Sequence, residues 1–305
     1  MLKKNRPLII TFLAPAVLCY LIVFLYPTIR TMVMSLFYVE SVSSSVAQWE
    51  FAGFANYVKL FNTPMFKTSM FNILRIWGAG GLVSLGLALV FAVILTNIGK
   101  NNCTKFMRSV IYLPNVVSAV AMGTMWLNFV YNSDYGFLHT LLQGLGFTKA
   151  ATTLWTAPGN LFWAMLWAYC FGMVGYHMLI FMSGIEQIPT DFFEAAYIAG
   201  ANGFQRFFYI TLPNLKGVIR TNIVMWTVYT VGFFVWGQLF SPVNLSNDTV
   251  APMNYMYELV FGASSSAKTA RDAGAGAGIG VILMLIVIVV FTVTNFITKN
   301  DDTEL

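Results

Sequence analysis

Residues 161–183 read LFWAMLWAYCFGMVGYHMLIFMS, an apolar run without an acidic residue, a lysine, an arginine or a proline. A helix needs about 20 such residues to cross a hydrocarbon core of roughly 30 Å. The whole chain has 305 residues, of which 58% are hydrophobic and only 10% are charged. A soluble domain carries roughly 25% charged residues. This composition predicts that the main solvent of the protein is a lipid bilayer.

Five further stretches of this kind lie on either side of the first one. Each is long and apolar enough to form a membrane-spanning helix. The six predicted spans are residues 8–34, 74–95, 110–131, 161–183, 219–240 and 277–297. We therefore expect an all-α, polytopic membrane protein with six transmembrane helices, surrounded by lipid.

The positions of lysine and arginine predict the orientation, because cytoplasmic segments carry the excess of these residues. With the N-terminus inside, ten of them are cytoplasmic: Lys3, Lys4, Arg6, Lys100, Lys105, Arg108, Arg206, Lys216, Arg220 and Lys299. Five are external, and two stand at the external ends of spans: Lys59, Lys67, Lys149, Lys268 and Arg271, then Arg30 and Arg75. This distribution predicts that both termini are cytoplasmic. The positive charges form no basic face, so we do not expect nucleic-acid binding.

Several chemical patterns are missing from the chain. It has no Gly-x-x-x-x-Gly-Lys-Ser/Thr segment, so we do not expect it to hydrolyse ATP. Its three cysteines and two histidines show no spacing typical of a metal site or a disulfide framework. No charged residue falls deep inside a predicted span, which argues against an ion-coupled carrier and against a channel built on charged rings. We expect neither a catalytic nor a metal site.

The predicted cytoplasmic segment of residues 185–217 carries the most specific pattern. Asp191 and Glu194 are spaced for a capping box at a helix N-terminus. Gly200 predicts a left-handed stop, and Pro213 predicts the end of the next helical segment. One small apolar face is expected from Phe192, Ala195, Ala196 and Ala199. The pattern alone leaves two interpretations open, a surface helix lying on the bundle or a helix that docks into a groove of another protein.

The segment resembles the cytoplasmic signature of ABC importer permeases, which reads Glu-Ala-Ala, three residues, Gly, nine residues, Ile-x-Leu-Pro. The matching residues are Glu194, Ala195, Ala196, Gly200, Ile210, Leu212 and Pro213. Other positions extend the resemblance to the carbohydrate (MalF/UgpA-like) permeases: Asn56-Tyr57, Leu60-Phe61, Phe66, Arg108, Leu113-Pro114, Gly123, Trp126, Tyr135-Gly136, Ser183-Gly184-Ile185 and Ile188-Pro189. The chain departs from that group after the fifth span, where Ser241-Pro242-Val243-Asn244 replaces a Gly-Gly-Pro turn. It also lacks the large external domain of the maltose permease.

The resemblance implies a type I ABC importer permease fold and a non-enzymatic subunit in the cytoplasmic membrane of a prokaryote. Residues 1–70 would form an N-terminal helix and external loop, residues 71–298 the permease core, and residues 299–305 a cytoplasmic tail. The implied partners are a second homologous permease, two ATPase subunits and an extracytoplasmic solute-binding protein. ATP and Mg would be bound by the ATPase subunits, which contact the seven matched residues, and no cofactor by this chain.

The implied substrate is a sugar or oligosaccharide. Sugar rings stack on aromatic side chains, and sugar hydroxyls need hydrogen bonds. The candidates for the substrate path are Tyr169, Tyr176, His177, Trp226, Tyr229, Phe233, Trp236 and Gln238. Packing within the bundle or against lipid is the competing interpretation for each of them. A permease for another solute, such as a phosphorylated polyol, would need lysine or arginine facing the path. A membrane enzyme or scaffold outside this family would need polar catalytic groups that meet in the bundle.

Overall fold

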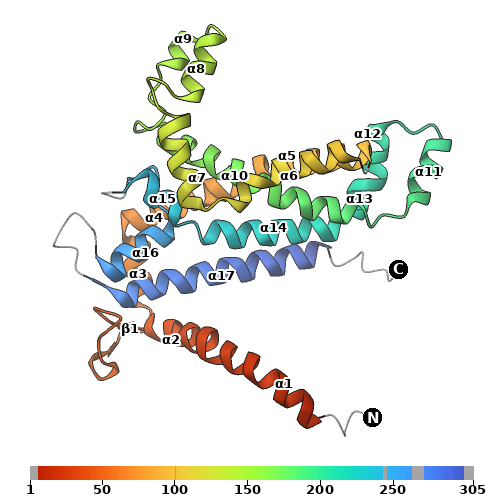
Figure 1. Cartoon of the computed structure of the whole chain (residues 1–305). Coiled ribbons are helices and arrows are strands. Elements are labelled where there is room, and N and C mark those ends of the chain that lie inside the picture. Colours follow the sequence, from red (N-terminus) through yellow and green to blue (C-terminus); the bar gives the residue numbers. More distant parts are fainter. Residues whose placement is uncertain (1–5, 100, 243–245, 263–270, 299–305) are drawn as a thin grey trace. The chain divides into compact units, whose positions relative to one another are not determined.

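The computed structural model describes residues 6–99, 101–242, 246–262 and 271–298 and is mostly helical, as predicted (Figure 1). It divides into two compact units, one of residues 1–67 and 255–285 and one of residues 68–254 and 286–305. Some residues of the sequence predictions lie outside the described residues, namely Lys3, Lys4, Lys100, Val243, Asn244, Lys268 and the tail 299–305. We describe each unit by itself.

The first unit contains the first predicted span and short external elements. Its elements are α1 (Arg6–Cys19), the π-helix η1 (Tyr20–Leu25), α2 (Tyr26–Met34), β1 (Phe37–Tyr38), η2 (Val46–Gln48), β2 (Glu50–Phe51), α3 (Ala55–Asn62) and parts of α4 (Pro64–Arg75), α16 (Pro252–Phe261) and α17 (Ala273–Thr298). The strands β1 and β2 pair antiparallel, with Phe37 opposite Phe51. A small apolar cluster of Met34, Val39, Ala273 and Ala277 joins the end of α2 to the start of α17.

The second unit is a helical bundle around α10 (Leu161–Ile185). Its other elements are η3 (Ile76–Gly80), α5 (Gly81–Ile98), α6 (Asn102–Val116), α7 (Ala119–Met125), η4 (Trp126–Val130), α8 (Phe137–Gly144), α9 (Thr148–Ala151), α11 (Thr190–Ile198), α12 (Gly203–Arg206), η5 (Phe207–Thr211), α13 (Leu212–Asn214), α14 (Lys216–Val231) and α15 (Val235–Phe240). The helix α10 packs against α5, α6 and α14. A side chain at Gly175 would collide with the backbone of Ile111 and Tyr112, so a glycine there allows α6 to approach α10 closely.

All six predicted spans are helical, but two of them are broken. Among the described residues, four helical stretches are long and apolar enough to cross a membrane without a sharp bend: Ile10–Met34, Pro64–Ile98, Leu161–Ile185 and Ala273–Thr298. The third predicted span is bent by 98° between α6 and α7. The bend follows the extended backbone of Val117, after which the Ser118 hydroxyl caps α7 by accepting from the Ala121 amide.

The fifth predicted span is also not one continuous helix. It consists of α14, with 16 residues, and α15, with six, separated by residues 232–234. At about 1.5 Å per residue, α14 alone is shorter than the hydrocarbon core. The third and fifth apolar stretches thus each consist of two helices that meet at a break.

Candidate functional site

The helix α11 carries the Glu-Ala-Ala motif and projects away from the helices around α10 (Figure 1). None of its nine residues is buried. Tyr197 and Ile198, near its end, are 75% and 86% exposed. Large apolar side chains exposed on a short helix mark a surface that another protein or a membrane covers. The placement favours the docking interpretation over a helix that lies on the bundle.

The C-terminal end of α11 is fixed by the predicted stop at Gly200. This glycine has φ of 75°, in the left-handed region, as the sequence predicted. The Gly200 amide donates to the Tyr197 carbonyl at 3.0 Å, and the Ala201 amide donates to the Ala196 carbonyl at 2.9 Å. This pair of bonds is the Schellman motif, which satisfies the last carbonyls of a helix. The motif makes the end of α11 a defined structure.

The prediction of a capping box at Asp191 and Glu194 was wrong. The helix begins at Thr190 with Pro189 as its cap residue, and this cap receives no side-chain hydrogen bond. Asp191 therefore lies inside the first turn. The capping box forms one helix later, where the Gln205 amide donates to Asn202 Oδ1 at 2.9 Å and the Asn202 amide donates to Gln205 Oε1 at 2.8 Å.

The remaining residues of the motif lie on a helical run that returns the chain to the bundle. Ile210 is in η5, and Leu212 and Pro213 are in α13, which ends one residue after Pro213. The Asn214 side chain donates to the Ile210 carbonyl at 2.7 Å. Leu215 follows and is fully buried in the cluster formed by α5 and α10. The run is thus anchored at its C-terminal end by packing.

The start of the cytoplasmic segment of residues 185–217 is joined to α6 by an ion pair. Arg108 Nη2 lies 2.8 Å from Glu186 Oε1, and Glu186 is the residue that caps α10. A cavity of about 300 Å³ lies beside Glu186, lined by Val93, Thr96, Asn97, Ile185, Ile188, Thr190, Phe193 and Thr211. The segment is therefore held at its start, at the first turn of α11 and at its C-terminal end, whereas Tyr197 and Ile198 at the end of α11 are exposed.

A second cavity lies where the two broken spans meet. It measures about 250 Å³ and is lined by residues of α6, α7, α10 and the break after α14. Four of the eight predicted path residues belong to its wall: Tyr169, Tyr229, Phe233 and Trp236. The rings of Tyr169 and Phe233 meet edge to face, with centroids 4.9 Å apart. Broken helices within a membrane leave backbone groups that can face a solute.

Tyr176 lies in a third cavity of about 430 Å³, between α6, α10 and α14. Polar side chains in its wall are Tyr112, Ser183, Gln187 and Thr221. The Tyr176 ring contacts the Tyr229 ring edge to face, with centroids 5.2 Å apart. Since Tyr229 lines the cavity at the breaks, this ring pair joins the walls of the two cavities.

The other three predicted path residues line neither of these two cavities. His177 is fully buried, and its Nδ1 lies 2.7 Å from Oδ1 of Asn222. The Trp226 indole donates from Nε1 to the Trp77 carbonyl at 2.9 Å. Gln238 lies on α15, two residues after Trp236, and belongs to neither lining. Packing explains the positions of His177 and Trp226 better than contact with a solute.

Three polar residues near the cavities were absent from the sequence prediction. Tyr112 and Asn115 reach the cavities from α6, and Asn222 holds His177 from α14. Asn115 donates from Nδ2 to the Gly172 carbonyl at 3.3 Å. The one signal in the sequence was an asparagine directly after Pro114, a combination that is typical of a distorted helix.

A family model described as "Binding-protein-dependent transport system inner membrane component" matches residues 86–300. The lactose transport system permease protein LacF of Rhizobium radiobacter is 29% identical over 261 residues, which cover 82% of each chain. The arabinooligosaccharides transport system permease protein AraP of Halalkalibacterium halodurans is 28% identical over 256 residues, covering 81% of this chain and 75% of that protein.

The fold also matches a solved structure, a bacterial ABC transporter involved in the import of the acidic polysaccharide alginate. The TM-score is 0.77 at 18% identity, and the match covers 99% of this chain and 98% of that chain. This match establishes the fold predicted from the sequence, that of an ABC importer permease.

Proposed function

Because the chain belongs to the family of inner membrane components of binding-protein-dependent transport systems, we propose that it forms one half of the import path for a sugar or oligosaccharide. As a member of this family it is a multi-pass membrane protein and a transport subunit rather than an enzyme. The second half of the path is a homologous permease. A solute-binding protein on the external side delivers the sugar.

The proposal rests on one observation. The end of α11 is exposed, while the residues before and after this helix are held in place by their contacts. Tyr197 and Ile198 need a partner that covers them, and the Schellman motif and the buried Leu215 hold the segment in shape. A rigid element of this kind can transmit a force from a partner to the spans. The partner in this proposal is an ATPase subunit, one on each permease. It binds ATP and Mg and contacts Glu194, Ala195, Ala196, Gly200 and the run of Ile210, Leu212 and Pro213.

The substrate path follows from the two cavities in the bundle. Tyr169, Tyr229, Phe233 and Trp236 offer aromatic faces at the breaks, and Tyr176 continues the path between α6, α10 and α14. Aromatic faces together with amide and hydroxyl groups are the chemistry that binds a sugar. His177 and Trp226 support the wall from behind in this proposal, and Gln238 lies beside it.

The class of substrate is supported by two independent observations. None of the described residues that line these two cavities is a lysine or arginine, so a phosphorylated polyol would meet no positive charge there. The named relatives LacF and AraP belong to lactose and arabinooligosaccharide transport systems. A neutral sugar or oligosaccharide fits both observations.

The orientation proposed from the loop charges puts both termini and α11 in the cytoplasm, where ATP is available. The protein then lies in the cytoplasmic membrane of a prokaryote. In this orientation α8 and α9, with Lys149 at the end of α9, face the external side. The match to the family begins at residue 86, inside the proposed core of residues 71–298 and after the N-terminal part of residues 1–70. The coupling segment of residues 185–217 lies within the same match.

Reconstitution tests the proposal. This chain, the second permease and the ATPase subunits are incorporated into proteoliposomes, and the sugar-loaded binding protein is added on the external side. We expect uptake of the sugar that requires ATP and every one of these components. Uptake driven by an ion gradient without the ATPase subunits would contradict the proposal. ATP hydrolysis by this chain alone would contradict it as well.

A further inference from the structure

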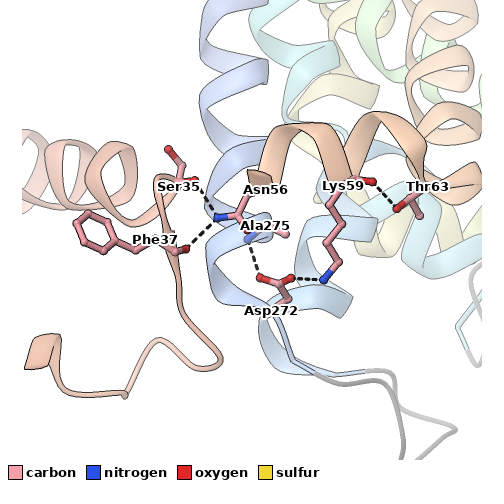
Figure 2. A network of polar contacts seen from close by, with 7 residues as sticks. All are labelled: Ser35, Phe37, Asn56, Lys59, Thr63, Asp272 and Ala275. Carbon is pink, nitrogen blue, oxygen red and sulfur yellow. Dashed lines mark hydrogen bonds and ion pairs between the residues drawn. The ribbon is translucent and has the colours of Figure 1, made fainter. Parts of the chain in front are cut away.

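The short helix α3 makes polar contacts with neighbouring elements through Asn56 and Lys59 and buries Leu60, whereas the large apolar side chains on its other face are exposed. It follows the β1–β2 hairpin and lies in the first unit, next to the end of α2 and the start of α17 (Figure 2). A helix on the surface of a soluble protein shows the opposite arrangement. The exposed apolar side chains of α3 therefore raise the question of whether water, lipid or another protein covers them.

The inner face is fastened to the end of α2 by Asn56. Its side chain is fully buried, and Nδ2 donates to the carbonyls of Ser35 and Phe37, each at 2.9 Å (Figure 2). The Tyr57 and Ser35 hydroxyls lie 2.7 Å apart, so a second side chain of α3 also contacts this point. Because Ser35 directly follows α2, these bonds set α3 at the level where the first span ends.

The same face is fastened to the start of α17 by Lys59. Its Nζ lies 2.6 Å from Oδ2 of Asp272, whose Oδ1 accepts from the Ala275 amide at 2.8 Å in the first turn of α17 (Figure 2). The Gly274 amide donates to the Val39 carbonyl at 3.0 Å, so the start of α17 and the end of α2 share one level. The helix α3 is therefore held at the common end of two membrane-spanning helices.

The outer face consists of large apolar side chains. Phe54, Val58 and Phe61 occur at spacings of four and three and are 75%, 59% and 55% exposed. Phe51, on the neighbouring strand β2, is exposed as well. Three such residues at one helical spacing form a continuous apolar face. A face of this kind is stable in the region between the lipid headgroups and the acyl chains.

We propose that α3 is an interfacial membrane helix whose face of Phe54, Val58 and Phe61 is covered by lipid. The depth carries this inference, because the run Ile10–Met34, which ends in α2, and α17 are each long and apolar enough to cross the hydrocarbon core, and α3 is held at the end of the first and the start of the second. Lys59 fits this location, because its charged end can reach Asp272 and water while its aliphatic chain stays at the membrane interface. The network of Ser35, Asn56, Lys59 and Asp272 then positions the outer ends of the first and last spans relative to the bilayer surface.

Fluorescence quenching tests the location in the whole transporter in nanodiscs. Single cysteines replace Val58, Phe61 or, as a control in the exposed hairpin loop, Ser43, in a chain without its native cysteines. Each is labelled with bimane. We expect lipids with a nitroxide near the headgroup to quench the label at Val58→Cys and Phe61→Cys, and aqueous iodide to quench the label at Ser43→Cys.

Two results would overturn the inference. In one, iodide quenches the labels at positions 58 and 61 as strongly as the label at position 43. In the other, lipid nitroxides have no effect on these labels, and their fluorescence changes only when the solute-binding protein is added, which would assign the face to that protein. The measurement needs neither ATP nor sugar, so its outcome does not depend on the proposed transport function.

Discussion

Arg108 on α6 and Glu186 at the end of α10 form an ion pair with 2.8 Å between Nη2 and Oε1. One partner stands on the helix whose other end lines the cavity at the breaks through Pro114, Asn115 and Val117. The other partner stands at the root of the segment that carries α11. The pair therefore joins the two parts of the proposed mechanism, the docking helix and the substrate cavity.

Reversing the charge of either partner should weaken coupling without unfolding the protein. Both side chains are partly exposed, and such pairs contribute only about 0.2–1 kcal/mol to stability. We expect Arg108→Glu and Glu186→Arg each to reduce sugar-stimulated ATP hydrolysis in the reconstituted complex, and the double exchange to restore part of it. Lys105→Ala removes a charge from an exposed position of the same helix and serves as the control. If the double exchange is worse than both single changes, the pair has no role in coupling.

Replacing Gly200 should disturb the end of α11. A non-glycine residue in the left-handed region costs about 1–2 kcal/mol, and a β-branched one fits least well. Gly200→Val should therefore lower both ATPase pull-down and uptake at matched membrane levels. The matched control is Gly203→Ala, since a Cβ at Gly203 meets no neighbour and its φ is not positive. Equal effects of the two variants would show that the Schellman motif is dispensable.

Glu194→Ala should leave the stability of the permease unchanged, because the capping box belongs to Asn202 and Gln205. Asn202→Ala removes that cap and should cost about 1 kcal/mol of local stability. If Glu194 contacts the ATPase, Glu194→Ala should reduce ATPase binding while the thermal unfolding midpoint stays the same. Asp191→Ala, which removes an acidic side chain from the first turn, is the control. Wild-type ATPase binding by Glu194→Ala would remove this residue from the interface.

Tyr229 should contribute to sugar passage, because it lines one cavity and contacts Tyr176 in the other. Aromatic contacts are worth about 0.5–1.5 kcal/mol, so Tyr229→Ala should reduce the maximal uptake rate roughly 2- to 12-fold. Trp167→Ala removes an exposed aromatic side chain from α10 and should have little effect on uptake. A larger loss for Trp167→Ala than for Tyr229→Ala would contradict the proposed path.

The ion pair of Lys59 and Asp272 should stabilise the folded protein at neutral pH and lose this effect at alkaline pH. The hydrogen bond to Asp272 raises the pKa of Lys59 above its ordinary value of 10.5. A raised lysine pKa stabilises the folded state below the ordinary value, and this contribution is lost as the pH rises through the folded value. The contribution is small because the lysine side chain is 61% exposed. The thermal unfolding midpoints of the wild type and of Lys59→Gln should therefore differ at neutral pH and become equal at high pH. A difference that grows with pH would contradict this.

The spans could be predicted from the sequence because long apolar runs have few alternatives in a membrane. The breaks could not, since hydropathy averages over a window longer than the bend at Val117 and Ser118. Which side chains are buried within the bundle could not be predicted from the sequence either. The helix α10 is apolar all round, so its sequence does not say that His177 turns into the core while Tyr176 turns toward a cavity. That distinction arises from packing against α6 and α14.

The local structure of the cytoplasmic segment of residues 185–217 could also be predicted only in part. Gly200 was predicted correctly, because a left-handed helix stop strongly favours glycine. The capping box was misplaced because Asp191 with Glu194 and Asn202 with Gln205 share the same spacing. Asp191 is not a cap residue because α11 already begins at Thr190, directly after Pro189, whereas Asn202 directly precedes α12.

The central claim is that α11 docks on an ATPase subunit, and photo-crosslinking from Tyr197 tests it most directly. A benzoylphenylalanine at Tyr197 or, as a control, at the exposed Phe147 beside α9 is activated in membranes that contain the whole transporter. We expect a covalent adduct between the chain and the ATPase from position 197 and none from position 147. No ATPase adduct from position 197, or an equal adduct from both positions, would contradict it.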